Sequence, residues 1–308
     1  EFTNEFNTLY SMNNHDRLIE LLTLWTLSYC SRVQEQFDAT EKVDCQELLN
    51  RGFDTERNLT NINNPLVMRY IVDTSRLYDN CHFYVAIFAA IKLCQSDPRF
   101  VGITISGPEH DWNAIQNFKT QMAIIKLLST KLEFRNFNLH AGELVKTLAE
   151  PFALATHIKD SIDAGSRRIG HAACLSDSNN WRQQLIPQMK REGICVEVCV
   201  SSNKKILNLK NGKHPINQLR KHTVPFVLCS DDSGVTRSEL KDEFRKVAKR
   251  YQEFDYKAFK KLSRNSISFS FLPGESIYRN TTDYTLKPLF SNLMDLNWKP
   301  SIEQNQFL

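Results

Sequence analysis

The sequence lacks a long apolar run. Its most apolar stretch, Leu18–Cys30, is too short to cross a bilayer, so we interpret it as a core helix and expect no membrane contact. A Cys-x-x-Cys motif is also absent: the eight cysteines are scattered, and several lie inside apolar segments such as ICVEVCV. These absences exclude a zinc knuckle and a disulfide framework, and they favour reduced thiols in a cytoplasmic protein.

Charge of one sign is not in large excess. The 308 residues include 39 Lys and Arg against 35 Asp and Glu, which gives a net charge of +4, and the basic residues form no stripe. The sequence therefore predicts no nucleic-acid surface. With 41% hydrophobic and 24% charged residues, the composition is typical of a globular protein.

Short apolar runs alternate with helical patterns from about residue 65. Each run is short enough to be a buried parallel strand. The candidate strands are Val67–Val72, Phe100–Ile105, Phe134–Leu139, Arg168–Gly170, Val196–Val200 and Phe226–Cys229. Amphipathic stretches lie between them, and the one after the third strand starts at Leu144, directly behind HAGE. Strands and helices at this spacing predict βα units and a parallel sheet.

The pattern divides the chain into three parts. Residues 65–275 fit a (β/α)₈ barrel of the TIM type better than a short doubly wound sheet, although periodicity alone does not separate the two. Residues 1–64 are expected to be an irregular or helical segment, the remainder of a longer chain, and residues 276–308 a C-terminal extension. The chain starts at Glu1 rather than methionine, so we expect that residue 1 is not the natural start.

Polar residues gather at the carboxyl end of nearly every candidate strand. SGPEHD follows the second strand, HAGE ends the third, His171 follows the fourth, SSN the fifth and SDDSG the sixth. Singly, each has an ordinary explanation, since SDDSG suits a helix N-cap and HAGE a turn with an acid in the first helical turn. The carboxyl ends of barrel strands converge on one rim, however, so the five clusters together predict a catalytic site.

The order of these motifs resembles that of the adenosine/AMP deaminase family. SGPE, HAGE, RIGH, VCVSSN, HP and SDD occur in the family's order, and the resemblance covers roughly residues 65–275. It implies a (β/α)₈ barrel of the metal-dependent hydrolase type with one Zn²⁺ per chain. It also implies hydrolysis of the 6-amino group of adenosine or an adenine nucleotide, which gives the inosine form and ammonia.

The resemblance also implies a role for each residue that matches a motif. His140 and Asp231 would ligate zinc, and His171 would orient the activated water and help to deprotonate it. Glu143 would protonate the ring nitrogen next to the attacked carbon. Zinc lowers the pKa of its water to about 7, and a carboxylic acid can discharge the negative charge that attack builds on the ring, so these residue types suit the chemistry.

Two further positions would bind the purine. The resemblance implies that the carboxylate of Asp232 hydrogen-bonds to the five-membered ring and that the backbone at Gly107 contacts the six-membered ring. Adjacent residues at the end of a strand point in different directions, so Asp231 can face a metal while Asp232 faces the ligand.

One element of the family pattern is missing. The family opens with a His-x-His pair that supplies two more zinc ligands, and this sequence contains no His-x-His. Two explanations stay open: the pair and the first strand or strands lie upstream of residue 1, or the metal site has been lost. We favour the first, because a decayed enzyme has no chemical reason to keep Glu143, His171, Asp231 and Asp232.

Two alternative functions remain. One is a catalytically inactive deaminase-like subunit that binds or assembles within a larger complex, such as a bacterial anti-phage system. The other is a different metal-dependent amidohydrolase. A cytidine-deaminase type of zinc site is not expected, because neither His-x-Glu nor Pro-Cys-x-x-Cys occurs. The sequence does not choose among the adenine compounds or specify an oligomeric state.

Overall fold

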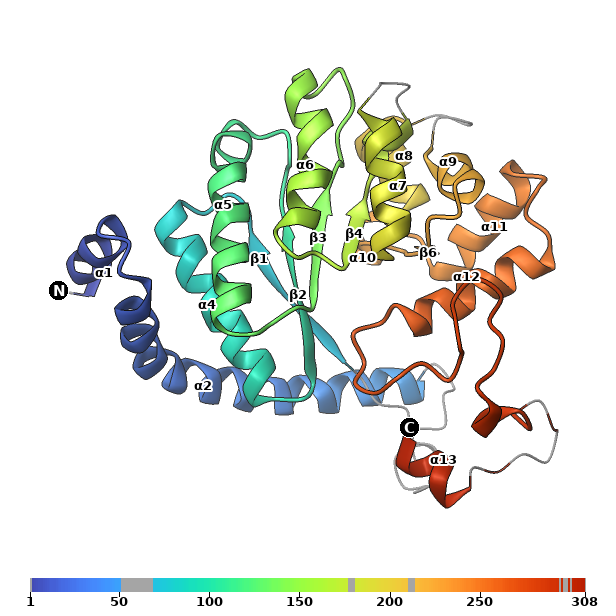
Figure 1. Ribbon diagram of the computed structural model, residues 1–308, viewed down its shortest axis with the longest axis horizontal. Helices are drawn as coiled ribbons and strands as arrows, with labels where there is room; N and C mark the ends of the chain where they lie inside the picture. The colour runs from blue at the N-terminus through green and yellow to red at the C-terminus, as the bar shows by residue number, and fades with distance from the viewer. Residues whose placement is uncertain are drawn as a thin grey trace. The chain divides into compact units, whose positions relative to one another are not determined.

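The computed structural model of the chain describes residues 2–50, 69–176, 181–209, 214–293, 295, 299 and 301–307. The chain divides into two compact units, Glu1–Asn136 and Phe137–Leu308 (Figure 1). Within the described ranges, no helix is both long and apolar enough to cross a membrane. The free thiols in the structure are those of Cys30, Cys81, Cys94, Cys174, Cys195, Cys199 and Cys229.

The first unit begins with two helices and continues with two strand–helix pairs. Its elements are α1 (Phe2–Ser11), α2 (His15–Asn50), β1 (Tyr70–Ser75), α4 (Asn80–Ser96), β2 (Phe100–Ser106) and α5 (Trp112–Lys131). The two strands pair in parallel, with Val72 opposite Ile103. Asp79 and Asp111 cap α4 and α5 by accepting backbone N–H groups of the first turn, which explains where these helices start.

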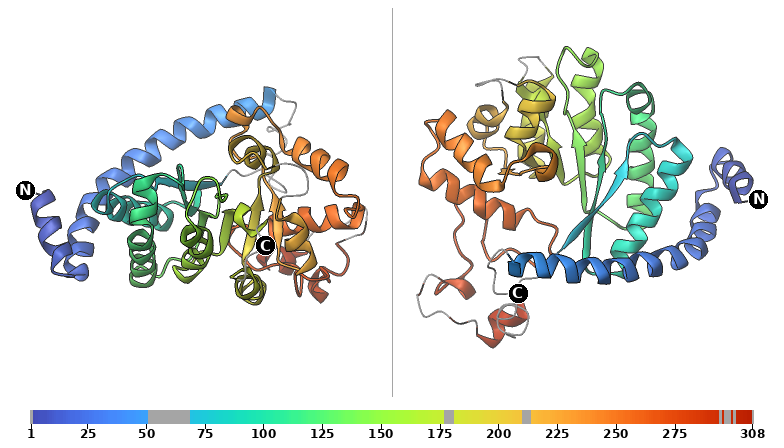
Figure 2. Two further views of the ribbon diagram at one scale, coloured as in Figure 1. Left: turned by 90° about the horizontal axis from the view of Figure 1, so that it is seen from above. Right: turned by 180° about the vertical axis from the view of Figure 1, so that it is seen from behind.

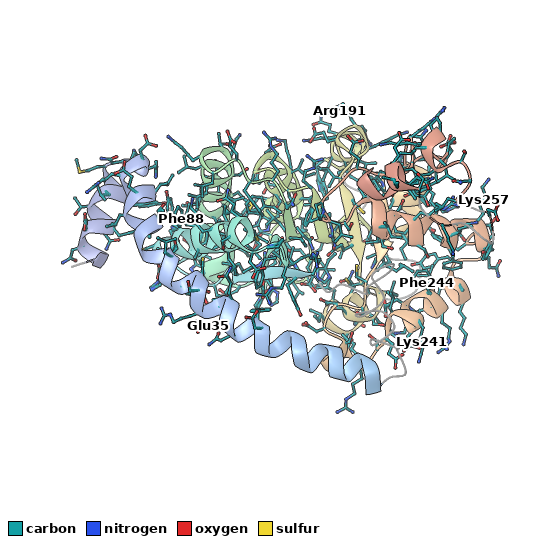
Figure 3. The ribbon with its side chains drawn as sticks, turned by 90° about the horizontal axis from the view of Figure 1, so that it is seen from below. Glu35, Phe88, Arg191, Lys241, Phe244 and Lys257 are labelled. Carbon is teal, nitrogen blue, oxygen red and sulfur yellow. The ribbon has the colours of Figure 1, made fainter. Side chains whose placement is uncertain are left out.

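The core of the first unit lies along α4. Phe83, Ile87 and Phe88 on this helix are fully buried, and Figure 3 shows Phe88 among the packed side chains. A smaller apolar cluster joins Cys30 of α2 to Leu93 and Phe100. The long helix α2 is therefore packed on the βα part of the same unit through apolar side chains.

The second unit contains four parallel strands in the order β3-β4-β5-β6, each followed by helices. The views in Figures 1 and 2 agree that α6 and α7 cover the same face of these strands. Its elements are β3 (Phe137–Ala141), α6 (Pro151–Asp163), β4 (Arg168–His171), η1 (Ala173–Ser176), α7 (Arg182–Glu192), β5 (Cys195–Val198), α8 (Val200–Ile206), α9 (Ile216–Lys221), β6 (Phe226–Leu228), α10 (Ser233–Thr236), α11 (Leu240–Arg250), α12 (Tyr256–Ser268), η2 (Pro288–Phe290) and α13 (Ile302–Phe307).

The six strands confirm the predicted parallel α/β class. Five of the predicted strands overlap an observed one within three residues at each end. The first was predicted as Val67–Val72, of which residues 67 and 68 lie outside the described ranges, and β1 continues to Ser75. Its last residues, Asp73, Thr74 and Ser75, are polar, and for this reason the apolar run stopped short. A closed barrel of the TIM type has eight strands, of which the described residues contain six.

The helix predicted directly after HAGE starts later than expected. Residues from Leu144 to Glu150 form a loop and turn, and α6 begins at Pro151. Proline suits the first turn of a helix, because its missing N–H would have no intrahelical partner there. The ordinary explanation of HAGE, an acid in the first helical turn, therefore does not hold, and a loop carries the Glu143 side chain.

The division of the chain at residues 64 and 275 stays a prediction. Residues 2–50 are largely helical, and residues 51–64 lie outside the described ranges. The boundary between the two compact units, after Asn136, falls inside the stretch predicted as one barrel. The described part of the predicted extension, residues 276–308, contains η2 and α13.

Candidate metal centre

Two histidines lie next to each other at the carboxyl ends of β3 and β4. The parallel register places His140 opposite Gly170 and Ala141 opposite His171. The two imidazole ring centres are 4.8 Å apart, with an angle of 54° between the ring planes. His171 is fully buried, whereas His140 is partly exposed. Two motifs that are separated by some thirty residues in the chain, HAGE and RIGH, thus present their histidines at one point.

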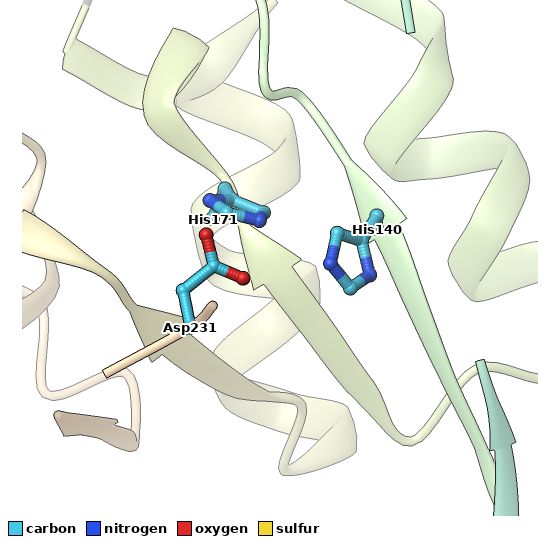
Figure 4. Close-up of side chains that lie close together, drawn as sticks. All are labelled: His140, His171 and Asp231. Atoms are coloured by element: carbon cyan, nitrogen blue, oxygen red, sulfur yellow. The ribbon is translucent and has the colours of Figure 1, made fainter. Parts of the chain in front are cut away.

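A carboxylate completes this group. Asp231 follows β6, and Figure 4 shows its carboxylate pointing toward the rings of His171 and His140. One potential ligand atom from each of the three residues lies within 4.8 Å of the others. Two imidazoles and one carboxylate are a donor set that suits Zn²⁺, and three protein ligands with an open position are typical of catalytic zinc sites. The residues therefore fit a metal ion of this kind.

The backbone is strained at two of these three residues. His171 has φ of 64° and Asp231 has φ of 56°, so both adopt the left-handed conformation that residues with a side chain rarely use. Such conformations cost about 1–3 kcal/mol each and cluster at functional sites. The two strained residues are those whose side chains, the imidazole of His171 and the carboxylate of Asp231, lie close together.

Two glycines make room for the group. A β-carbon on Gly170 would lie 3.2 Å from Cγ and Nδ1 of His140, which is closer than side chains normally approach. Gly142 has φ of 74°, and a β-carbon there would lie 2.7 Å from atoms of Ile158 and Cys174. The turn that carries the chain away from β3 therefore requires glycine, as does the approach of the His140 ring to β4.

Glu143 lies beside His171. Its Oε1 is 3.6 Å from Nδ1 of His171, and 14% of its side chain is exposed. A carboxyl group this enclosed, next to an imidazole, is placed where it could hold or pass a proton. Its role as a proton donor stays a prediction.

The two residues predicted to bind the purine are in different units. Asp232 is exposed and occupies the N-cap of α10, where its carbonyl oxygen accepts the N–H of Thr236 at 2.8 Å. Asp232 is therefore at the N-cap position that SDDSG suggests, but its carboxylate makes no capping hydrogen bond to the backbone of α10. Gly107 directly follows β2 in the first unit, with φ of 102°. Both roles stay predictions.

A hydrogen-bonded chain leads from His171 into the core, and sequence reasoning did not assign it a role. Nδ1 of His171 lies 2.8 Å from Oδ1 of Asn203, and Nδ2 of Asn203 lies 2.9 Å from Nε2 of His214. All three side chains are buried. The motifs SSN and HP contain Asn203 and His214, but in the sequence they indicate the order of the family motifs rather than a chemical role.

The two thiols near the group differ: the pKa of Cys199 is raised, whereas the hydrogen bond with Cys199 lowers the pKa of Cys229. A hydrogen bond with Cys229 and burial raise the pKa of the Cys199 thiol, and the carboxylates of Asp231 and Glu143 raise it further. Because a thiol binds metal only after it loses its proton, Cys199 is a poor competitor for an ion held by His140, His171 and Asp231.

Comparison with known sequences identifies the protein family of this chain. The profile of the adenosine deaminase family matches residues 42–279. Among curated proteins, an adenosine deaminase from Clostridium perfringens is 25% identical over 219 residues, which cover 68% of this chain and 61% of that protein. An adenosine deaminase from Enterococcus faecalis is 27% identical and is covered to 46%. The chain thus spans about half to three-fifths of the length of these relatives.

Solved structures with a similar fold come from a plant and from a bacterium. The Arabidopsis protein ADAL, solved in complex with IMP, has a TM-score of 0.52 and 21% identity, over 66% of this chain and 53% of that one. A Burkholderia ambifaria amidohydrolase, solved with bound Zn, has a TM-score of 0.54 and 15% identity, over 72% and 56%. At such identities the likeness concerns the fold.

Proposed function

Because the chain belongs to the adenosine deaminase family, we propose that it hydrolyses the 6-amino group of adenosine or an adenine nucleotide in a zinc-dependent reaction. The observation that carries this proposal is the convergence of His140, His171 and Asp231 from three different strand ends. Ammonia and the corresponding inosine compound are the products. The whole reaction is proposed for the complete protein, since the chain spans only part of its relatives' length.

His140 and Asp231 would hold the ion in this proposal, with His171 at its side. A bound zinc ion supplies Lewis acidity, which makes water a competent nucleophile near neutral pH. Nδ1 of His171 is hydrogen-bonded to Oδ1 of Asn203. The lone pair of Nε2 is then available either to ligate the ion or to accept a proton from the attacking water. Both uses need the same ring orientation.

Glu143 is the proposed proton donor. Attack on the carbon that carries the amino group places negative charge on the ring, and a carboxylic acid at the adjacent nitrogen neutralises this charge. The enclosed position of the carboxyl, 3.6 Å from His171, supports this role because burial favours the protonated form of a carboxyl group.

Purine recognition is proposed for Asp232 and Gly107. The exposed carboxylate of Asp232 adjoins the ligand residue Asp231 in the chain and is free of any capping bond, so it suits a hydrogen bond to the five-membered ring. The absence of a side chain at Gly107 suits direct contact between the backbone and the six-membered ring. Two solved structures of Arabidopsis ADAL contain IMP and GMP, which supports a purine nucleotide as one candidate substrate.

Metal content and ammonia release test the proposal together. Elemental analysis of the purified protein should find close to one zinc ion per chain, and adenosine or one of its nucleotides should release ammonia. Glu143→Gln should retain the zinc and lose nearly all turnover, because the amide cannot donate the proton. If Glu143→Gln keeps its turnover, the assignment of the proton donor is wrong.

The same measurements decide between the proposal and its alternatives. Protein that contains no metal and converts none of the adenine compounds would support an inactive subunit that serves binding or assembly. Protein that contains metal but hydrolyses only other amides or amines would support a different amidohydrolase.

A further inference from the structure

The network behind His171 has a fixed direction of donation. Asn203 offers Oδ1 toward Nδ1 of His171 at 2.8 Å and Nδ2 toward Nε2 of His214 at 2.9 Å. An amide oxygen only accepts, so Nδ1 of His171 must carry a proton. An amide nitrogen only donates, so Nε2 of His214 must accept. The lone pair of His171 is then confined to Nε2.

His214 keeps the amide of Asn203 in this orientation. Burial lowers the pKa of His214 to about 3, so its ring is neutral at physiological pH, and with its proton on Nδ1 the Nε2 atom accepts from the Asn203 amide. If the amide were reversed, its nitrogen would face His171 and would force the proton of that ring onto Nε2. A neutral His214 that carries its proton on Nδ1 therefore specifies which nitrogen of His171 is left without a proton.

The helix that carries Asn203 is itself fixed. The carboxylate of Glu243 on α11 is fully buried and accepts the backbone N–H of Ser201 in the first turn of α8 at 3.0 Å, and it also accepts the hydroxyl of Ser201. Lys246 lies 3.3 Å from the same carboxylate and compensates its charge. Asn203 thus approaches His171 from a helix that is held at its start.

We propose that Asn203 and His214 are positioning residues that hold His171 in the Nδ1–H tautomer, with Nε2 turned toward His140 and Asp231. The consequence for metal binding rests on the proposed function, whereas the tautomer of His171 does not. Residues that orient a metal-binding histidine typically change metal affinity by about 10–100-fold when they are altered.

Nitrogen NMR of the metal-free chain tests the tautomer directly. With ¹⁵N-labelled histidine, and with the His171 signals identified by their loss in His171→Gln, Nδ1 should be protonated and Nε2 unprotonated. Asn203→Leu should give a mixture of tautomers, whereas Asn203→Asp should keep the Nδ1–H form because its carboxylate still accepts. His214→Phe should also give a mixture, and His222→Phe, at an exposed histidine, should not.

Metal binding supplies the second readout. Asn203→Leu should weaken the zinc Kd at least tenfold, and Asn203→Asp should restore most of the affinity. A His171 that is protonated on Nε2 in the unaltered chain, or that keeps its tautomer in Asn203→Leu, would overturn the proposal. A chain that shows the Nδ1–H form but binds no zinc and releases no ammonia would refute the proposed function and leave the positioning role intact.

An independent cavity lies at the other end of the strands in the second unit. It has a volume of about 500 Å³ and reaches Gly193, just before β5, and Pro225 and Phe226 at the start of β6. The metal group occupies the carboxyl ends of the strands, so the two sites are separate. The volume is within the range of about 300–1,000 Å³ that is typical of small-molecule sites.

The charged side chains that line this cavity are all cations, namely Lys190, Arg220 and Lys261. Phe226, Phe254 and Leu262 provide an apolar floor, and the guanidinium of Arg220 lies 6.0 Å from the ring centre of Phe254. The guanidinium of Arg220 is also 3.9 Å from the carboxylate of Glu253. Because this ion pair is exposed and long, it holds the guanidinium only weakly.

From this lining we infer that the cavity binds a small anion with an apolar body, of the class that nucleoside diphosphates represent. Three cations match the phosphate charge, and the aromatic and aliphatic floor matches a base. Uridine diphosphate is a suitable probe, because a pyrimidine does not carry the amino group that the metal site is proposed to hydrolyse.

Calorimetric titration with uridine diphosphate, uridine and pyrophosphate tests this inference. The diphosphate should bind more tightly than either part alone. The double variant Arg220→Ala with Lys261→Ala should weaken its Kd at least tenfold. The matched pair Lys257→Ala with Lys260→Ala, at exposed positions on α12 that do not line the cavity, should leave it unchanged; Figure 3 shows Lys257 at the edge of the unit. Binding that is absent at millimolar probe, or equal losses in both variants, would overturn the inference.

Discussion

Gly170 on β4 lies directly opposite His140 on β3, and a β-carbon on Gly170 would be 3.2 Å from Cγ and 3.3 Å from Cα of that histidine. The second of these atoms belongs to the backbone of a neighbouring strand, so it cannot move aside as a flexible side chain would. The residue type at position 170 therefore controls where the His140 ring can lie.

Gly170→Ala should displace the His140 ring and spread the two strands. We expect a loss of about 1–3 kcal/mol in the free energy of unfolding, as is usual when a packed site is overfilled. The zinc Kd should weaken at least tenfold, which equilibrium dialysis can measure. Gly234→Ala is the matched control, because a β-carbon there meets no atom within 4 Å. If both variants bind zinc equally well, Gly170 does not shape the site.

Zinc should stabilise the chain through the three converging side chains. A ligand that binds only the folded state adds about 2.7 kcal/mol at a hundred times its Kd, so the melting temperature should rise on zinc addition and fall again with a chelator. His140→Ala should abolish this shift. His222→Ala, at an exposed histidine in the same unit, should retain it. A shift that survives in His140→Ala would place the ion elsewhere.

The stability of the metal-free chain should fall as the pH drops from about 6.5 to about 3. Burial lowers the pKa of His214 to about 3, so in this window the unfolded chain binds a proton that the folded chain excludes. The free energy of unfolding therefore rises with pH across the window. His214→Phe should reduce the slope by up to about 1.4 kcal/mol per pH unit in urea denaturation between pH 4 and 6. Equal slopes in the two proteins would contradict the assignment.

Arg168 at the start of β4 compensates the charge of a buried carboxylate on β5. Its guanidinium pairs with Glu197, which also accepts the amide of Asn138 at 2.9 Å. Arg168→Leu should cost about 3–5 kcal/mol because it leaves the charge of Glu197 without its partner. Adding Glu197→Gln should recover much of this loss, which chemical denaturation would measure.

An exposed ion pair provides the control for this experiment. Arg191 and Glu192 lie 3.1 Å apart on the surface, and Figure 3 shows Arg191 at the rim of the unit. Arg191→Leu should cost less than about 1 kcal/mol. A similar cost for Arg168→Leu would mean that the Arg168–Glu197 pair is solvated rather than buried.

The strands could be predicted because each is an apolar run bounded by polar residues. The end of β1 could not be predicted in this way. The strand continues through Asp73, Thr74 and Ser75, whose polar side chains a periodicity argument assigns to a loop. The start of α6 was missed for a similar reason. Leu144 and Val145 continue the apolar pattern of the helix, and only Pro151 indicates where the helix begins.

The metal group was predictable in part. HAGE, RIGH and SDD each indicate one residue, and the structure brings potential ligand atoms of these residues close together. The position of His171 among the potential ligands depends on strand register, which one sequence does not specify. The same is true of Asn203 and His214, whose contacts to each other and to His171 depend on how α8 is held against α11.

The left-handed backbone at His171 and Asp231 limits which residues a saturation library can recover there. Asparagine and glycine adopt this conformation more readily than other residues, whereas valine and isoleucine are nearly barred from it. Folded clones should therefore be enriched in asparagine and glycine at both positions, whether or not they retain any chemistry. An alanine scan that ignores this geometry would count a folding defect as a lost ligand.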